Sequence, residues 1–357
     1  MKVKFYLDNE RIYDFTQIWT NRLIFEEIEK IDVEKETHFF IYRPWKEPFE
    51  FIHKNLKGKG CKIVLWIVDC VETFYSKESD YCKQLEKLSD EDIFLASPNF
   101  NSNDMEFPVK TSWTYSMLDP VNERKKWNHN LLRWLHKHSK NYVRQKHFLS
   151  FNGTLKHHRF DLLNFICSNK LADKFYVSFG SNQRGDKIKL PDDVKENMTQ
   201  EEISYYTDKH LDIPKDSPYM TANLNFTLYF NSYFDIVTAT ECNTDSVYID
   251  EKVWKSFASF KPMILIGEPL TLKFLRGLGF RTFSPFIDES YDDVTDYDKR
   301  KKIIYDEITR LSNLTLNELD DIYWKMTDVL NHNFNQLNKV ETNTNKNLVE
   351  EFVKSYD

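Results

Sequence analysis

The fold class is decided by residues 234–292, which read FDIVTATECNTDSVYIDEKVWKSFASFKPMILIGEPLTLKFLRGLGFRTFSPFIDESYD. The pattern predicts a strand, a loop, a helix, a strand, a helix and a strand in that order. It places Glu251 and Lys252 in the first turn of the first helix. A lysine beside the free N–H groups of a helix N-terminus suits a diphosphate, and an adjacent carboxylate suits ribose hydroxyls. The stretch therefore predicts an α/β domain with a nucleotide site.

The rest of the chain alternates strand and helix signals in the same way. Short apolar runs rich in β-branched and aromatic residues are separated by amphipathic segments, which is typical of parallel strands covered by helices. The predicted strands outside residues 234–292 are 3–7, 37–42, 61–69, 92–97, 146–151 and 174–179, and the main predicted helices are 15–31, 75–88, 123–142 and 157–167.

A length of 357 residues predicts about two domains. We expect an N-terminal α/β domain over 1–145 and a second, Rossmann-like domain over 146–337. Residues 180–225 are predicted to be mostly loop. An Asn/Thr-rich break at 341–347 is expected to precede a C-terminal helix within 338–357, which packs back on the first domain.

Composition excludes several classes of protein. No apolar run approaches the ~20 residues that span a bilayer, and the N-terminus lacks the apolar core of a secretory signal. The net charge of −7 argues against a dedicated nucleic-acid binder without excluding a local basic cleft. Five cysteines without CxxC spacing favour reduced thiols and a cytoplasmic location. They are Cys61, Cys70, Cys82, Cys167 and Cys242.

The motifs of residues 234–292 resemble the donor-binding half of GT-B glycosyltransferases. The order is a strand ending in Glu, a short acidic loop, aromatic-x-x-Glu-Lys-x-Trp, then Lys-Pro, an apolar run and Gly. The nearest groups are the α1,3-fucosyltransferase-like and exostosin-like enzymes, including those of viruses and phages. The resemblance covers about 146–330. The residues that carry it are Glu241, Tyr248, Glu251, Lys252, Trp254, Lys261, Pro262 and Gly267.

This resemblance implies two Rossmann-like domains that face each other across a cleft. The N-terminal domain would bind the acceptor, and the second domain would bind a GDP- or UDP-linked sugar. The implied reaction moves the sugar to a hydroxyl of a glycan or another acceptor, with inversion and without a metal or other cofactor. A viral member would act in the cytoplasm of its host, with no stable membrane insertion.

The resemblance also assigns roles around the Glu-Lys pair. Glu251 would bind the ribose, Lys252 the diphosphate, and Tyr248 would border the base. Spacing alone supports another interpretation, because Asp250 is a plausible N-cap and Glu251 in the first turn complements the helix dipole.

The segment Phe151-Asn152-Gly153-Thr154 resembles the first strand-turn-helix of the donor domain. By resemblance, Arg159 in the following helix binds the diphosphate through its bidentate fork, with Lys156 as a second choice. A solvated helix face is the alternative for Arg159. Gly267 is implied to lie close to the donor, while the apolar run before it packs the core.

Two carboxylates are the last residues of predicted strands, Asp69 of 61–69 and Glu241 of 234–241. Ligands of open α/β sheets bind outside the carboxyl ends of strands, so both candidates point to a cleft. Each is alternatively an ordinary polar strand terminus. An inverting enzyme needs a carboxylate of the N-terminal domain as general base, for which we expect Asp69 first and Glu72 next.

Metal ligands are not predicted. The D-x-D string at 296–298 falls where a polar helix begins, and the histidines of 129–138 lack tetrahedral spacing on one face. The acidic run 288–293 is predicted to be a solvated loop.

Two other functions compete with the first. A DNA-modifying glycosyltransferase acting on hydroxymethylated bases would use the basic residues of 43–62, which otherwise suit a surface strand and turn. A non-catalytic nucleotide-sugar-binding module would keep the fold without turnover.

Overall fold

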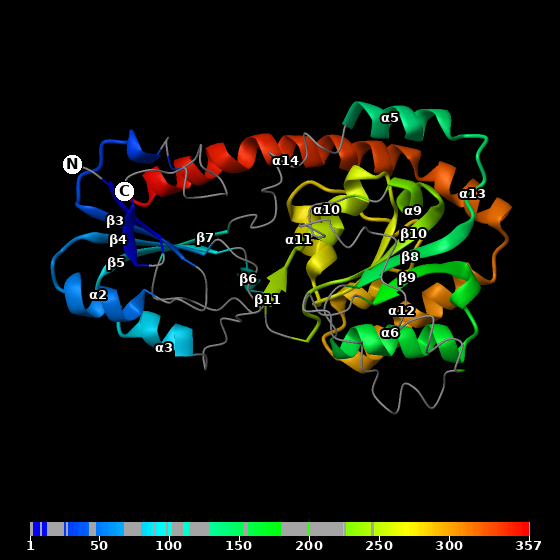
Figure 1. The fold of residues 1–357 in the computed structure, drawn as a ribbon, viewed down its shortest axis with the longest axis horizontal. Helices are drawn as coiled ribbons and strands as arrows, with labels where there is room; N and C mark the ends of the chain where they lie inside the picture. Colours follow the sequence, from blue (N-terminus) through cyan, green and yellow to red (C-terminus); the bar gives the residue numbers. More distant parts are fainter. Residues whose placement is uncertain are drawn as a thin grey trace. The chain divides into compact units, whose positions relative to one another are not determined.

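The computed structural model contains two compact units (Figure 1). Unit 1 comprises Met1–Val121, Thr244–Asp250 and Asn338–Asp357, and unit 2 comprises Asn122–Asn243 and Glu251–Leu337. Each unit has a sheet of mainly parallel strands, so the predicted α/β fold is confirmed. The residues that the structure describes are 3–7, 9–12, 25, 28–42, 48–67, 80–88, 90–97, 99–101, 110–113, 129–152, 156–179, 199, 224, 226–243 and 246–356.

Unit 1 is built on a six-stranded sheet in the order β2-β1-β3-β4-β5-β7. Strand β2 is antiparallel to β1, and the other neighbours are parallel. The bounds are β1 Val3–Leu7, β2 Glu10–Ile12, β3 Thr37–Tyr42, α2 Phe49–Asn55, β4 Lys62–Ile67, α3 Asp80–Glu86, β5 Asp92–Ser97 and β7 Lys110–Trp113.

The two faces of this sheet carry separate apolar cores, because successive side chains of a strand point to opposite faces. Phe40 packs in one core, together with Ile52 of α2 and Leu85 of α3. Phe39 packs in the other core, which includes Phe352 from the end of the chain. The C-terminal residues therefore complete the core of the first unit, as predicted.

The C-terminal helix is longer than expected. A single helix, α14 Thr327–Lys354, runs through the Asn/Thr-rich stretch where a break was predicted. Asn and Thr weaken a helix only mildly, and buried residues anchor both ends, Phe334 in unit 2 and Phe352 in unit 1. The buried Lys62 also donates to the carbonyl oxygen of Ser355 at 2.7 Å, which satisfies a backbone acceptor at the end of the helix.

A two-stranded antiparallel ladder joins β6 Asn99–Asn101 to β11 Ser246–Tyr248. Both strands belong to unit 1, although β11 lies in the chain between two elements of unit 2. The sequence predicted only a loop here, because strands of three residues are too short to show alternation.

Unit 2 has a parallel sheet in the order β12-β10-β8-β9. Figure 1 shows α6 and α12 on one side of this sheet and α9 and α10 on the other. The bounds are α5 His129–His138, β8 Lys146–Asn152, α6 His157–Ser168, a 3-10 turn Ala172–Lys174, β9 Phe175–Phe179, α9 Phe226–Phe230, β10 Ser232–Thr238, α10 Glu251–Ala258, β12 Met263–Ile266, α11 Thr271–Gly277, a 3-10 turn Ser290–Asp293, α12 Tyr297–Ser312 and α13 Leu316–Lys325.

The last strand predicted from residues 234–292 is wrong. Residues 279–283 form no strand, although Phe280 and Phe283 are buried there. The side chain of Asn333 in α14 accepts from the N–H of Arg281 at 2.8 Å and donates to its carbonyl at 2.7 Å. A helix side chain thus satisfies the backbone groups that a neighbouring strand would otherwise pair.

The buried His136 predicts a pH dependence of stability. Its ring stacks on Phe260 at 4.2 Å, and burial, aided by the charges of Arg144 and Lys261, lowers its pKa from 6.5 to about 3. A depressed pKa contributes stability above pH 6.5 that is lost as the pH falls toward the folded value. We expect the wild type to lose about 2 kcal/mol from this group between pH 6.5 and 5.

Chemical denaturation at several pH values checks this expectation. His136→Gln should have the shallower dependence on pH, since it lacks the titrating group. His138→Gln is the matched control, because His138 is exposed on the same helix and should leave the dependence unchanged. Identical slopes for wild type and His136→Gln would contradict the assignment.

Candidate functional site

The candidate site lies at the carboxyl-terminal edge of the unit 2 sheet. Strand β8 comes first in the chain but lies between β9 and β10, so the strand order reverses beside it. Open α/β sheets bind ligands at such a reversal, outside the strand ends. The hydroxyl of Thr238, which ends β10, donates to the side chain of Asn152, which ends β8. Among the described strands of unit 1, the parallel ones follow chain order without a reversal.

The start of α6 supplies one side of this edge. Arg159 Nη2 and His158 Nε2 lie 3.1 Å and 2.9 Å from the carbonyl oxygen of Ala239, just after β10. Because a carbonyl only accepts, His158 carries its proton on Nε2. Lys156 forms an ion pair with Glu241, and both side chains are partly exposed. These contacts hold the turn after β10 against the start of α6.

The start of α10 supplies the other side. Lys252 Nζ lies 3.4 Å from Glu251 Oε1, and the two side chains are only 15% and 14% exposed. The rest of the helix is buried from Val253 to Ala258, including Trp254 and Phe257, which fixes α10 in the unit 2 core. The first turn of α10 therefore presents a positioned ammonium and carboxylate.

Electrostatics connect the starts of α6 and α10. Burial, aided by the positive charges of Arg159, Lys156 and Lys252, lowers the pKa of His158 from 6.5 to about 4. His158 is therefore neutral at pH 7. The edge combines three cations with the carboxylates Glu241 and Glu251, a set that suits an anion bearing hydroxyl groups.

Gly267 lies directly after β12 at the same edge. A Cβ atom on Gly267 would lie 3.1 Å from the Cβ of Ala239 and 3.3 Å from the Cγ of Leu265. Real Cβ atoms rarely approach so closely, and interiors as dense as this accommodate added volume poorly. Glycine therefore lets the end of β12 approach the turn that His158 and Arg159 hold.

The edge brings together most of the predicted donor residues: Asn152, Arg159, Glu241, Glu251, Lys252 and Gly267. Four other predicted site residues cannot be placed at this edge. Asp69, Glu72 and Gly153 lie outside the described residues, and Tyr248 is described only for its backbone in β11.

Two local expectations are wrong. Strand β10 ends at Thr238, so Glu241 follows the strand by three residues. The reason is that His158 and Arg159 bind the carbonyl of Ala239, where a strand partner would otherwise bind. The solvated-face alternative fails for Arg159, which is 3% exposed, although the neighbouring His157 side chain is 85% exposed.

Two buried residues of the site escaped sequence analysis. His158 directly follows the exposed His157, and a single sequence does not distinguish a buried histidine from an exposed one. Arg300 of α12 donates to the carbonyl of Cys242, and also to those of Val294 and Thr295 at 2.8 Å and 2.9 Å. It thereby ties the turn after β10 to α12, across a sequence separation that no local pattern reveals.

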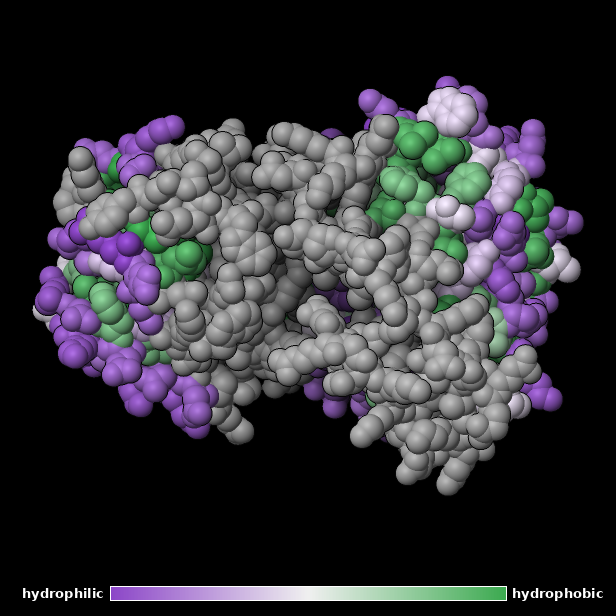
Figure 2. All heavy atoms as spheres, viewed as in Figure 1, coloured by the Kyte–Doolittle hydropathy of each residue, from purple (hydrophilic) through white to green (hydrophobic). Residues whose placement is uncertain are grey.

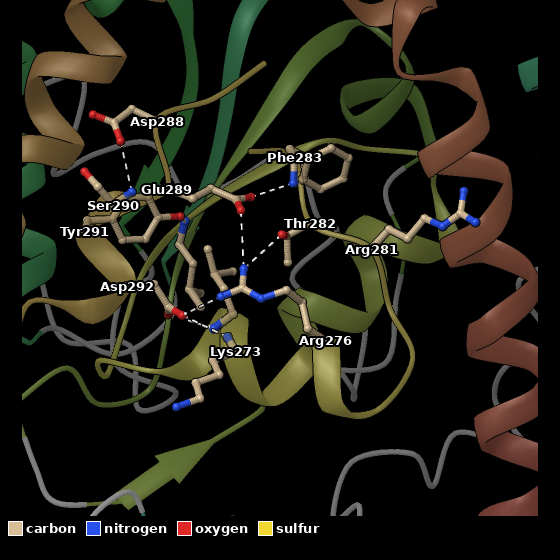
Figure 3. Close-up of polar contacts among 12 residues, drawn as sticks. Lys273, Arg276, Arg281, Thr282, Phe283, Asp288, Glu289, Ser290, Tyr291 and Asp292 are labelled. Carbon is tan, nitrogen blue, oxygen red and sulfur yellow. Dashed lines mark hydrogen bonds and ion pairs between the residues drawn. The ribbon is translucent and has the colours of Figure 1, made fainter. Parts of the chain in front are cut away.

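The acidic run 288–293 is only in part the solvated loop that was predicted, because Glu289, Tyr291 and Asp292 are buried (Figure 3). Asp292 is buried and accepts from the N–H groups of Leu272 and Lys273, both at 2.8 Å, at the start of α11. Arg276 lies 3.4 Å from Asp292 and 3.5 Å from Glu289. Asp292 therefore caps α11 from a distance in sequence, and Glu289 and Asp292 are engaged within the fold, whereas Asp288 and Asp293 are exposed.

Across the residues that the structure describes, no three His, Cys, Asp or Glu side chains are grouped to hold a metal ion. The D-x-D string has structural contacts instead. Asp296 caps α12 by accepting from the N–H of Lys299 at 2.9 Å, and Asp298 lies 3.0 Å from Lys301. Nor does any helix within the described ranges have the length and apolar character to cross a membrane.

No protein-family model matches the sequence, and comparison with curated proteins finds no match. Among solved structures, the chain is similar to a trehalose-6-phosphate synthase studied with bisubstrate glycomimetics. The identity is 12% over 95% of this chain and 81% of that one, with a TM-score of 0.44.

Two further structures are similar at comparable distance. An α,α-trehalose-phosphate synthase (UDP-forming) from Burkholderia xenovorans is 10% identical over 93% of this chain and 79% of that one, with a TM-score of 0.42. The wall teichoic acid polymerase TagF is 12% identical over 99% and 90%, with a TM-score of 0.29. Likenesses this distant say nothing about the activity of this chain, which is inferred from its own residues.

Proposed function

We propose that the protein is a glycosyltransferase whose unit 2 binds a nucleotide diphosphate sugar at the β8–β10 edge. The observation that carries this proposal is the grouping of Lys156, Arg159 and Lys252 with Glu241 and Glu251 where the strand order reverses. Cations suit a diphosphate, and carboxylates suit the hydroxyls of ribose and sugar. The motif around Glu251 and Lys252, which resembles fucosyltransferase-like enzymes, supports a GDP- or UDP-linked donor.

The contacts suggest a division of roles among the cations. Lys252 and Lys156, at 15% and 16% exposure, bring their ammonium groups to the edge, where they would contact the diphosphate. Arg159 is more deeply buried and donates to the Ala239 carbonyl. It would therefore add positive charge beneath the diphosphate and keep the turn after β10 in place. Glu251 would accept hydrogen bonds from the ribose hydroxyls.

In the proposed reaction, the bond between the sugar carbon and the diphosphate oxygen breaks as the acceptor oxygen attacks that carbon. Negative charge grows on the departing diphosphate, where Lys252 and Lys156 stabilise it without a metal. With inversion, the acceptor hydroxyl gives its proton to a carboxylate of unit 1, for which Asp69 and then Glu72 remain our candidates. Unit 1 would also bind the acceptor.

A thermal-shift screen with UDP-, GDP- and CMP-sugars tests the proposal. A ligand at 100 times its Kd stabilises the folded state by about 2.7 kcal/mol, so one nucleotide class should raise the melting temperature by several degrees. Slow hydrolysis of that nucleotide sugar without an acceptor would indicate an enzyme, and binding without any turnover would indicate a binding module. No shift with any nucleotide would contradict the proposal.

Glu251→Ala should weaken binding of the free nucleoside diphosphate by about tenfold, since one charge-assisted hydrogen bond to ribose is lost. The preference among sugars should stay the same, because the ribose is remote from the sugar. Calorimetric titration with the nucleotide found in the screen measures both.

Asp298→Ala is the matched control for Glu251→Ala. Asp298 also lies in the first turn of a helix and pairs with Lys301, as Glu251 pairs with Lys252. Its loss therefore reports the helix-dipole and ion-pair contributions at an 84% exposed side chain. Equal small losses of stability in both variants, with unchanged nucleotide affinity, would favour the dipole role for Glu251.

A further inference from the structure

The chain contains one strongly basic segment despite its net charge of −7. Residues 124–160 hold ten Lys and Arg and no Asp or Glu, whereas the whole chain has 49 Lys and Arg against 56 Asp and Glu. Helix α5 lies in this segment. Its sequence, HNLLRWLHKH, combines basic residues with leucine and tryptophan.

Helix α5 has a buried face and an exposed face. Leu132, His136 and Ser139 are buried at helical spacing, which fixes the helix on unit 2. On the outer side, Leu131 is 42% exposed and Trp134, one turn further, is 55% exposed. Large apolar side chains are thus displayed on the side that faces away from the core.

Basic residues flank these apolar side chains. Arg133, Lys137 and Lys140 are exposed. We call Leu131, Arg133, Trp134, Lys137, His138 and Lys140 the α5 surface. Figure 2 shows pale and green residues among purple ones over α5, at the upper right.

The stretch of α14 beside Arg133 adds no negative charge. Arg133 Nη2 donates to Asn335 Oδ1 of α14 at 3.0 Å and its guanidinium carbon lies 5.0 Å from the ring of Phe334, so this stretch of α14 lies beside α5. Residues 331–339 of α14 contain no Asp or Glu. The α5 surface is therefore positive as well as apolar.

We propose that the α5 surface docks the protein on an anionic phospholipid bilayer. An amphipathic helix with Lys and Arg at its borders and Trp and Leu at its centre binds in the interfacial plane of such a bilayer. Trp is favoured at that depth because its ring is apolar and its N–H remains hydrogen-bonded. Here the indole of Trp134 already stacks on His138 at 4.5 Å, so one face of the ring is occupied.

Nucleic acid is the other anionic macromolecule to consider, and it fits less well. Stacking of bases requires open aromatic faces, and His138 leaves only one face of the exposed Trp134 ring for a base. The exposed aliphatic Leu131 has no role in binding phosphates but suits the acyl boundary of a bilayer.

Co-sedimentation with vesicles tests the proposal. The full chain should bind vesicles of phosphatidylcholine mixed with phosphatidylglycerol and should not bind phosphatidylcholine alone. Lys137→Gln and Lys140→Gln should each weaken binding roughly fivefold, the usual contribution of one basic residue near an anionic surface. Trp134→Ser should abolish the binding that remains at high salt, because salt screens the lysines but not apolar contacts.

Matched controls use the same substitutions elsewhere. Lys302→Gln changes an exposed lysine of α12, and Val353→Ser changes a 43% exposed apolar residue of α14, so both should bind vesicles like the wild type. Melting temperatures verify that every variant is folded. Equal binding by all variants, or no binding to anionic vesicles, would overturn the proposal. Tight binding of single-stranded DNA, with vesicles ignored, would overturn it in favour of a nucleic-acid surface.

Discussion

Replacing Lys252 with alanine is expected to lower kcat/KM for sugar transfer by about 10²–10³-fold, the usual effect of removing one donor to a developing anion. The ammonium is partly exposed in the first turn of α10 and lies 3.4 Å from Glu251 Oε1. Its loss should therefore change the free energy of unfolding by no more than about 0.5 kcal/mol. Steady-state kinetics with the identified donor, together with a melting curve, measures both effects.

Lys302→Ala is the control for Lys252→Ala. Lys302 is an exposed lysine of the same unit, paired with Asp306 at 2.6 Å, and its removal should leave transfer unchanged. Wild-type turnover by Lys252→Ala would contradict the assignment of the diphosphate to this edge.

Phe352→Ala is expected to lower the free energy of unfolding by about 3–5 kcal/mol, the usual loss for truncating a buried phenylalanine. Phe352 is 1% exposed and packs against Phe39 and Phe94, with ring centroids at 6.1 Å and 6.4 Å. The core of unit 1 therefore depends on the last residues of the chain. Urea denaturation of the full chain measures the loss.

Val353→Ala provides the comparison, because Val353 is the next residue and is 43% exposed. We expect its effect to stay within about 0.5 kcal/mol. If Phe352→Ala lowered the free energy of unfolding as little as Val353→Ala, Phe352 would not be packed in the core of unit 1 as described.

The elements that build the site could be predicted because their signals are local. The apolar run 146–151 and the amphipathic segment 157–167 correspond to β8 and α6, and Glu251 opens α10 as expected. Strand ends in a parallel sheet meet at one edge, which is why Asn152 lies close to the end of β10.

The remaining features depend on contacts between distant residues. The end of β10 is set by His158 and Arg159, which bind the carbonyl of Ala239 from α6. Asp292 caps α11 from 20 residues further along the chain. Tertiary contacts of this kind override local propensity. They produce no periodic pattern in a single sequence, so they cannot be predicted from it.

The continuity of α14 has a similar origin. Its Asn/Thr-rich middle reads as a break, yet the helix is anchored at Phe334 and again at Phe352. Helical stability in proteins comes mostly from packing rather than propensity. The packing of Phe334 and Phe352 can therefore keep the Asn/Thr-rich segment between them helical.

The most direct test of the donor site is a crystal structure of the chain with the nucleoside diphosphate that most raises its melting temperature. We predict that the diphosphate lies within hydrogen-bond distance of Lys252 Nζ, at the edge formed by the ends of β8 and β10. The ribose hydroxyls should contact the carboxylate of Glu251. A nucleotide bound with full occupancy away from this edge, leaving Lys252 and Glu251 without contact to it, would contradict the proposed function.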